Sequence, residues 1–280
     1  MGNFHCSTNR IPRGLPRGYS FVCFFLRNPN LQQIKGVNVY ESRENHYLCF
    51  PKDDSSIITA NMEVYNFSET NSLLNSYVRE IRDITIQNDR LRFRRNIERI
   101  GEIMAYEISK KLKYKKIEVT TPLDVAEVRI PDEEIVIGTI LRAGLPYHHG
   151  MLNYFDGADN AFVSAYRKYK ETGHQSFDIH IEYIASPSIE GKTLILTDPM
   201  LATGGSMELT YRALLTKGTP SHIHIATIIA SRQAVEYCIH NFPAANTTIW
   251  AAAIDPGLNE SSYIVPGIGD AGDLSYGQKL

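Results

Sequence analysis

The sequence predicts an α/β domain with a mostly parallel central sheet that is flanked by helices. From about residue 70 to the C-terminus, short apolar runs alternate with stretches of helical periodicity. Strand–helix–strand alternation of this kind places parallel strands side by side, with helices on both faces of the sheet. The composition, with 43% hydrophobic and 21% charged residues among 280, is that of an ordinary globular chain.

The spacing of apolar residues predicts the elements in chain order. A first helix occupies 73–81 behind the cap residues Thr70 and Asn71, and a second begins near Asp89. Ligands of parallel sheets bind beyond the carboxyl ends of the strands, so chemistry is expected in the loops there. The remaining expected elements are strands at 135–141, 161–166, 178–185, 193–197, 222–230 and 248–254, and helices at 144–155, 206–217 and 233–241.

Residues 1–61 differ from the rest of the chain. They carry turn signals such as IPRGLPRG and FPKDDSS and show no sustained periodicity. We interpret them as a disordered leader or as translated sequence upstream of a natural start at Met62. Removing 61 of the 280 residues leaves 219, and the domain then spans 62–280. A targeting peptide is the alternative, because an apolar run at 21–26 follows three arginines, although no small-residue cleavage site comes after it.

Charge and hydropathy argue against two classes of partner. The formal net charge of −2 provides no overall positive field for nucleic acid. No stretch approaches the ~20 consecutive apolar residues of a membrane-spanning helix, so we expect no membrane partner. The four cysteines form no CxxC pair, which favours reduced thiols in a cytoplasmic protein.

The most informative segment is TLILTDPMLATGGS, which runs from Thr193 to Ser206. A buried strand delivers Asp198 to its carboxyl end, and a tight turn at 203–206 then opens a helix. Two glycines let backbone N–H groups approach a ligand, while the helix N-terminus adds donors and partial positive charge. The segment predicts a cradle for a phosphate monoester, with the Asp198 carboxylate close enough to accept from sugar hydroxyls. It matches neither a P-loop nor a dinucleotide fingerprint.

This segment resembles the motif with which type I phosphoribosyltransferases bind 5-phosphoribosyl 1-pyrophosphate (PRPP). Most of that family has two adjacent acids after the strand, whereas Pro199 takes the second position here. The variant DPMLATGGS resembles the uracil phosphoribosyltransferases in particular. The resemblance implies that PRPP is bound by Arg142, Arg167, Asp198, Pro199, Met200, Leu201, Ala202, Thr203, Gly204, Gly205, Ser206 and Asp270.

Two further stretches are similar to the same family and extend the resemblance to about residues 70–280. In ILRAGL at 140–145, Arg142 corresponds to the arginine that contacts pyrophosphate, a role that suits a guanidinium. Tyr166 and Arg167, with the polar stretch 168–175, resemble the flexible catalytic loop that closes over PRPP. Such a loop would exclude water from a donor that could otherwise hydrolyse.

The C-terminal segments 254–260 and 263–273 are crowded with glycine and proline. A fixed irregular loop of this kind exposes backbone N–H and C=O groups, which match the two carbonyls and the imide N–H of uracil. The run YIVPGIGDAGD resembles the base-binding loop of the uracil phosphoribosyltransferases. The resemblance implies a small hood of terminal segments over the site, with uracil bound by Ile264, Gly269, Asp270 and Ala271.

Taken together, the resemblance implies a pentosyltransferase that joins the phosphoribosyl group of PRPP to N1 of uracil, giving UMP and pyrophosphate in pyrimidine salvage. Arg142, Arg167 and Asp270 are its expected catalytic residues, with Asp270 acting either as general base or as an anchor for water and metal. Mg²⁺ is expected to arrive with PRPP rather than on a dedicated ligand cluster. A homodimer or higher homo-oligomer is implied, as is GTP as a candidate effector.

Two other hypotheses stay open. One is a phosphoribosyltransferase for another base, against which the uracil-type C-terminal loop argues. The other is a sensor of PRPP or pyrimidine that regulates RNA and has lost catalysis. The intact residues Arg142, Arg167, Asp198 and Asp270 argue against such a loss, and the lack of a basic stripe argues against RNA.

Overall fold

The computed structural model describes residues 19–21, 38–42, 45–51, 62–169 and 177–278. The chain forms two compact units, Met1–Thr59 and Ala60–Leu280. In the first unit an antiparallel sheet has the order β1-β3-β2. These strands were not predicted, because the first 61 residues are rich in turn signals and show no sustained apolar alternation. Whether this unit is a leader, an upstream extension or a targeting peptide stays a prediction. The strands are β1 (Tyr19–Phe21), β2 (Asn38–Ser42) and β3 (Asn45–Pro51).

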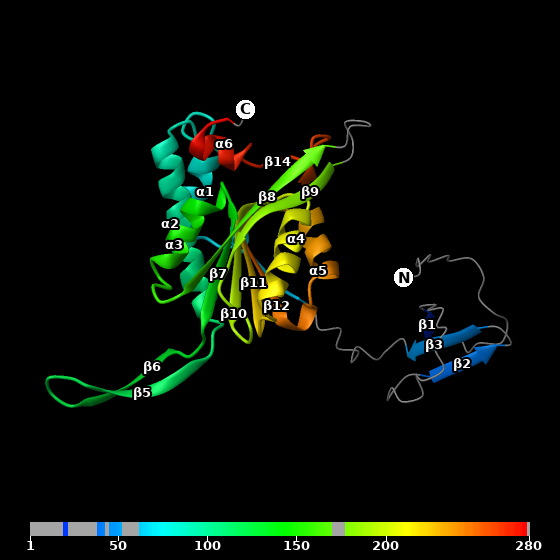
Figure 1. Ribbon diagram of the computed structural model, residues 1–280, viewed down its shortest axis with the longest axis horizontal. Coiled ribbons are helices and arrows are strands. Elements are labelled where there is room, and N and C mark those ends of the chain that lie inside the picture. The colour runs from blue at the N-terminus through cyan, green and yellow to red at the C-terminus, as the bar shows by residue number, and fades with distance from the viewer. Residues whose placement is uncertain (1–18, 22–37, 43–44, 52–61, 170–176, 279–280) are drawn as a thin grey trace. The chain divides into compact units, whose positions relative to one another are not determined.

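A seven-stranded sheet in the order β4-β12-β11-β10-β7-β8-β9 forms the centre of the second unit (Figure 1). Neighbouring strands pair in parallel except for β8 and β9, which are antiparallel. The predicted fold class, a mostly parallel sheet flanked by helices, is therefore confirmed. The strands are β4 (Glu63–Asn66), β7 (Ile135–Leu141), β8 (Asp159–Tyr169), β9 (Phe177–Ala185), β10 (Thr193–Leu201), β11 (His222–Ser231) and β12 (Thr247–Asp255).

Helices cover both faces of this sheet, with α1, α2 and α3 on one side and α4 and α5 on the other (Figure 1). Each face has its own core: Ile100 of α2 packs in a cluster with Ile195 and Trp250, and Leu214 of α4 packs in another with Leu196. Burial on both faces explains why the central strands are nearly continuous apolar runs. The helices are α1 (Leu74–Arg82), α2 (Arg90–Ser109), α3 (Gly144–Leu152), α4 (Gly205–Leu214), α5 (Arg232–Asn241) and α6 (Ala271–Tyr276), with 3₁₀ turns η1 (Phe67–Glu69), η2 (Leu215–Lys217) and η3 (Ala244–Asn246).

The helix ends follow local capping chemistry. Helix α2 begins next to Asp89, as predicted, and Asp89 caps it, since its Oδ1 accepts from the N–H of Arg92 at 3.0 Å. At the start of α1, Ser72 takes the place of the expected cap residues, and its Oγ accepts from the N–H of Leu74 at 3.2 Å. Gly218 ends the helical segment that begins with α4, as predicted, with a φ of 126° that favours glycine.

Strand β10 continues beyond the predicted range 193–197. Asp198 pairs with Thr227 of β11, and Leu201 pairs with Ala230. The extension has a long-range cause, because β11 runs alongside β10 to Ser231 and provides backbone partners for the extra residues. Asp198 consequently lies within the strand rather than directly after it.

An antiparallel hairpin, β5 (Tyr114–Thr120) with β6 (Val125–Pro131), projects from the sheet (Figure 1). We call it the hairpin arm. Its residues are exposed or half-exposed throughout both strands. The sequence pattern did not predict this hairpin, because charged residues interrupt its apolar alternation and neither of its faces is buried.

The C-terminal segment forms the hood that the resemblance implied. Short strands β13 (Gly257–Leu258) and β14 (Ile264–Val265) pair antiparallel. Helix α6 then packs against α2, where Nη1 of Arg94 donates to the carbonyl of Ser275 at 2.7 Å. In the described part of the chain, no helix is long and apolar enough to cross a membrane.

Candidate active site

A cleft of about 730 Å³ lies at the carboxyl ends of β7 and β10, where parallel sheets bind their ligands. Four stretches supply its walls, namely the end of β7, the end of β10 with the start of α4, the segment from 261 to the start of β14, and the segment around the start of α6. Its lining residues are Ile140, Leu141, Arg142, Ala143, Asp198, Met200, Ala202, Ser206, Ser261, Ser262, Tyr263, Ile264, Gly269, Asp270, Ala271 and Gly272.

The turn before α4 requires glycine at position 204 for two reasons. Its φ of +85° lies in the left-handed region. A Cβ there would also lie 2.5 Å from Cδ1 of Tyr237, whose hydroxyl donates to Glu208. The first N–H groups of a helix have no intrahelical partner, so the start of α4 offers donors beside Ser206 at the edge of the cleft. This arrangement suits a phosphate group.

Arg142 directly follows β7 and enters the cleft. Its Nη2 donates to Oδ1 of Asp273 at 3.2 Å and to the carbonyl of Gly277 at 3.3 Å. Its Nε is buried and has no hydrogen-bond partner among the described residues. A guanidinium with a donor still unsatisfied in a concave site suits phosphate oxygens.

Two carboxylates at the cleft are oriented by the backbone. Oδ1 of Asp198 accepts from the N–H of Met200 at 3.1 Å. Asp270 caps α6, where its Oδ1 accepts from the N–H of Asp273 at 2.9 Å. Both carboxylates are thereby held in place for a positively charged or hydroxyl-bearing ligand.

The cleft gathers most of the predicted site residues but not all. The side chain of Leu201 is 2% exposed and packs in the core, and Pro199 is buried as well. The cause is the extension of β10, because alternation along a strand turns successive side chains to opposite faces. Thr203, Gly204 and Gly205 form the turn into α4 without lining the cleft. The predicted residues that line it are Arg142, Asp198, Met200, Ala202, Ser206, Ile264, Gly269, Asp270 and Ala271.

Arg167 lies within β8, where its backbone pairs with Ile179 of β9. Its side chain lies outside the described atoms. The predicted catalytic loop at 168–175 begins inside this strand, since β8 continues to Tyr169, and residues 170–176 fall outside the described part of the chain.

Sequence reasoning missed several residues that the fold brings to the cleft. Asp273, which lies 131 residues from Arg142, pairs with it, and the only local signal was its place in the quoted run YIVPGIGDAGD. Ser261 and Tyr263 line the cleft because Asn259 organises their turn. Its Oδ1 accepts from their N–H groups at 3.0 and 2.9 Å.

Two buried histidines outside the cleft stay neutral at physiological pH. Burial lowers the pKa of His148 to about 4, and it lowers the pKa of His224 to about 3. Nε1 of Trp250 donates to Nδ1 of His224 at 3.0 Å, which assigns the acceptor nitrogen of that ring. Neither histidine lines the cleft, and within the described ranges no group of three or more His, Cys, Asp and Glu could hold a metal ion.

The parallel sheet and the phosphate-type turn at its carboxyl edge place the chain in the class of type I phosphoribosyltransferases. The fold is similar to that of a solved structure, the AQ2163 protein from Aquifex aeolicus. It is 29% identical with a TM-score of 0.67, over 76% of this chain and 98% of that one.

Within this class, a family model described as uracil phosphoribosyltransferase matches residues 68–278. The chain belongs to the uracil phosphoribosyltransferase family. It is 67% identical over 219 residues to the uracil phosphoribosyltransferase of Porphyromonas gingivalis, covering 78% of this chain and 100% of the relative. The relative of the same name from Methanothermobacter thermautotrophicus is 37% identical over 188 residues, covering 66% and 84%. The family predicted from the motifs is confirmed, and with it the expected enzyme class, a pentosyltransferase.

Proposed function

We propose that this chain transfers the phosphoribosyl group of PRPP to N1 of uracil, forming UMP and releasing pyrophosphate. The observation that carries the proposal is that Ser206 at the start of α4, Arg142 and the loop before α6 line one and the same cleft. Family membership supports the same reaction.

The two ends of PRPP bind at different walls of the cleft. The 5-phosphate takes the N–H donors at the start of α4 together with the hydroxyls of Thr203 and Ser206. The carboxylate of Asp198 accepts hydrogen bonds from the ribose hydroxyls. Arg142 binds the pyrophosphate, and Arg167 joins it in binding this leaving group.

Uracil binds against the loop that leads into α6. Backbone groups near Gly269 and Ala271 match the carbonyls and the N–H of the base, while the buried Ile264 supports the ring. A site of this kind rejects bases that leave its polar groups unpaired.

In the transfer, the bond between C1 and pyrophosphate breaks first, and positive charge develops on C1 and the ring oxygen. The carboxylates at the cleft stabilise this charge, and Arg142 stabilises the negative charge on the leaving group. N1 of uracil forms the new bond to C1 and loses its proton. Asp270 either accepts that proton or anchors water and metal, and the substitution of Asp270 by Asn distinguishes these roles by the pH dependence of turnover.

The donor set of the cleft fits a hydrated Mg²⁺ ion that arrives with PRPP. Asp198, Asp270, Ser261 and Ser262 present oxygen atoms along its walls. Mg²⁺ takes oxygen ligands and retains several waters, so it needs few protein contacts. When bound, it would neutralise charge on the pyrophosphate.

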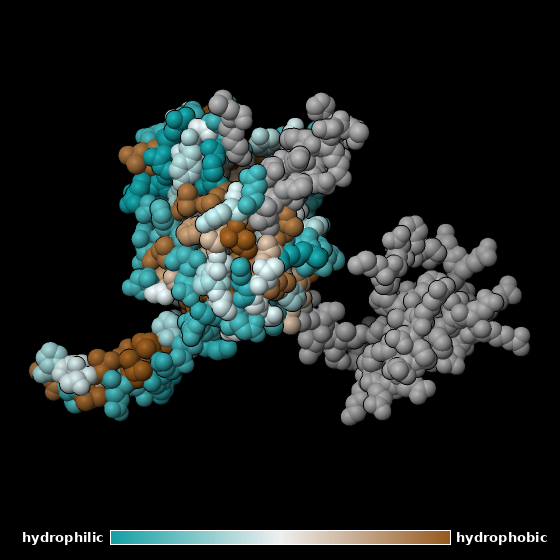
Figure 2. Space-filling view, in the orientation of Figure 1, coloured by the Kyte–Doolittle hydropathy of each residue, from teal (hydrophilic) through white to brown (hydrophobic). Residues whose placement is uncertain are grey.

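The enzyme is a homodimer or a larger homo-oligomer in this proposal. The support is the hairpin arm, which exposes apolar side chains without a described partner in its own chain. Figure 2 shows hydrophobic residues, in brown, gathered on the hairpin arm. The exposed apolar side chains of the arm include Leu123, 97% exposed, and Val125, 55% exposed. We also propose a location in the cytoplasm, which rests on the composition of the chain. The proposed role of GTP as an effector rests on the family resemblance. The assignment of catalysis to residues 62–280 is tested by assaying that segment beside the full chain.

The decisive experiment incubates the purified protein with PRPP, Mg²⁺ and uracil, beside cytosine, hypoxanthine and orotate, and separates the nucleotides by chromatography. The proposal requires UMP from uracil and no nucleotide from the other bases. A different nucleotide would assign the enzyme to another base. Absence of any nucleotide, with a melting temperature raised by PRPP or UMP, would instead identify a sensor that has lost catalysis.

A further inference from the structure

The loop between β14 and α6 is held from behind at Gly267. This residue has a φ of +58°, and a Cβ there would lie 2.1 Å from the carbonyl oxygen of Ile264, so no side chain fits. Both backbone polar groups of Gly267 are engaged by side chains. Its N–H donates to Oδ2 of Asp255 at 2.8 Å, and its carbonyl accepts from Nη1 of Arg82 at 2.9 Å.

The two side chains that hold Gly267 also bind each other. Arg82 donates from Nη1 to Oδ2 of Asp255 at 2.9 Å and from Nη2 to Oδ1 at 2.7 Å. Such a two-pronged pair fixes orientation as well as distance. The Asp255 side chain is 7% exposed and that of Arg82 is 24% exposed, so solvent screens the pair only in part.

The pair joins three elements that are remote in the sequence. Arg82 is the last residue of α1, and Asp255 is the last residue of β12, 173 residues further along. Neither residue lines the cleft of about 730 Å³. Gly267, however, lies between Ile264 and Gly269, which both do.

We propose that Arg82 and Asp255 act as positioning residues for base recognition, by fixing the peptide groups of Gly267 and hence the backbone that faces uracil. The inference rests on the proposed function, because it names the residues that determine specificity in the same site. Loss of the pair weakens binding and discrimination of the base, and leaves the distant phosphate site at α4 intact.

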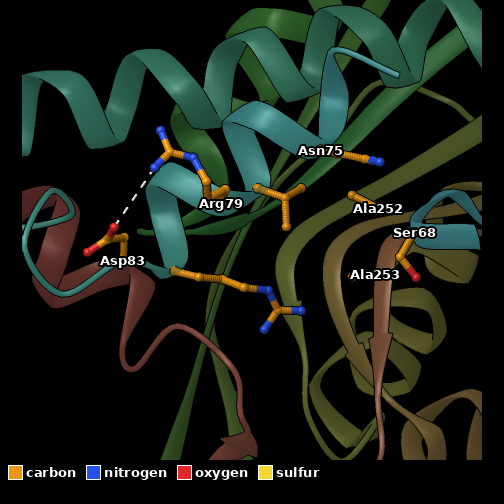
Figure 3. Close-up of a pocket in the computed structure, with 8 residues that line it drawn as sticks. Ser68, Asn75, Arg79, Asp83, Ala252 and Ala253 are labelled. Atoms are coloured by element: carbon orange, nitrogen blue, oxygen red, sulfur yellow. Dashed lines mark ion pairs between the residues drawn. The ribbon is translucent and has the colours of Figure 1, made fainter. Parts of the chain in front are cut away.

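A second cavity, of about 460 Å³, gives access to Arg82 from outside the active site. Figure 3 shows Arg79 and Asp83 along one side of this cavity and Ala252 and Ala253 along another, with a dashed line for the Arg79–Asp83 pair at 4.0 Å. The side chain of Arg79 is 63% exposed, and its ion-pair partners among the described residues are Glu80 and Asp83 rather than groups of the loop. Arg79 is thus a matched control, an arginine one helical turn away in the same helix and cavity.

The test compares Arg82→Lys, Asp255→Asn and the control Arg79→Lys in the full chain. Lysine keeps the charge of arginine but cannot form the two-pronged contact. We expect the first two variants to raise KM for uracil on the order of tenfold, because a buried hydrogen-bonded charge loses a partner. KM for PRPP stays within about twofold, since its phosphate cradle lies on other elements. Arg79→Lys leaves both constants unchanged.

Hydrogen–deuterium exchange of residues 264–272 provides a readout that does not depend on activity. Faster exchange there in Arg82→Lys, but not in Arg79→Lys, is the expected result. Unchanged exchange, or a KM for uracil that does not rise, overturns the proposal. If the wild-type protein forms no UMP, the proposed function fails, while faster loop exchange still supports the positioning role.

A third variant covers the case in which the substitutions damage the fold generally. Arg82→Ala is assayed with and without millimolar methylguanidinium, which can enter through the cavity of Figure 3. Partial recovery of KM for uracil and of slow loop exchange supports the role of the guanidinium at this position. No recovery, in a variant whose melting curve stays cooperative, contradicts it.

Discussion

The hairpin arm and the ribbon formed by β13 and β14 are both two-stranded antiparallel elements outside the central sheet, yet they are stabilised in opposite ways. The ribbon contains the buried Ile264, at 4% exposure, and the loop after it contains the buried Ile268, at 3% exposure, and is held at Gly267 by the Arg82–Asp255 pair. The arm has ion pairs as well, such as Lys116 with Glu127 at 2.8 Å, but both of these side chains are more than half exposed.

The difference shows that burial, rather than the number of polar contacts, determines how firmly a ribbon is held. Exposed ion pairs contribute about 0–1 kcal/mol because water competes for both charges. Removal of one partner from a buried pair costs about 3–5 kcal/mol, because the other charge is left without compensation. An isolated two-stranded hairpin is at best marginally stable in water. The ribbon at the cleft can therefore present a fixed backbone to a ligand, whereas the arm is suited to being covered by another surface.

The largest expected effect of a substitution is on catalysis, in the cleft beside the ribbon. Arg142→Ala should lower kcat about 10²–10³-fold, since it removes charge stabilisation from the leaving pyrophosphate. Stability should change little, because the Arg142–Asp273 pair is 39% and 31% exposed. Steady-state kinetics together with urea unfolding measure both. Full activity in this variant would refute the pyrophosphate assignment.

The next largest effect is on the free energy of unfolding, and it tests the contrast between a buried and an exposed ion pair. Asp255→Ala leaves the guanidinium of Arg82 and the N–H of Gly267 without their acceptor. The free energy of unfolding should fall by about 3 kcal/mol. Urea denaturation followed by circular dichroism measures the loss. A change below about 1 kcal/mol would mean that this pair is no stronger than a surface pair.

A smaller change in the free energy of unfolding, but a large change in assembly, is expected at the arm. Leu123→Asp places a charge on a side chain that is 97% exposed in the single chain. If another copy covers the arm, light scattering after gel filtration should report a smaller particle, while the melting curve of the domain stays cooperative. Lys116→Glu, a charge change on the same arm, is the control. An unchanged particle mass would show that the tip of the arm is not part of an interface.

The smallest effect is expected for Lys116→Ala, which removes an exposed ion pair of the arm. Its cost in unfolding free energy should be below about 0.5 kcal/mol. The same urea measurement applies. A loss as large as that of Asp255→Ala would remove the distinction between the two ribbons.

Local patterns predicted the elements well wherever the deciding interactions are themselves local. Strand β7 has the bounds expected from its apolar run, and α2 starts at Arg90, next to the predicted position Asp89. The predicted end of β10 was wrong, because the last residues of this strand are extended only through pairing with β11. The hairpin arm was missed because it buries no face, so its sequence carries no clear apolar period.

The sequence by itself determined the fold class, the family and the phosphate-type turn. In each case the signal lies within a few residues. The spacing of apolar residues predicts the strands and helices, and the glycine at 204, which accepts a positive φ just before a helix starts, predicts the turn. Only the tertiary structure decided which residues of the motif face the cleft, with Ala202 lining it while Leu201 packs in the core. It also decided the Arg82–Asp255 pair. Backbone sterics and helix capping act over a turn or less, whereas an ion pair between residues 173 apart exists only once the chain has folded.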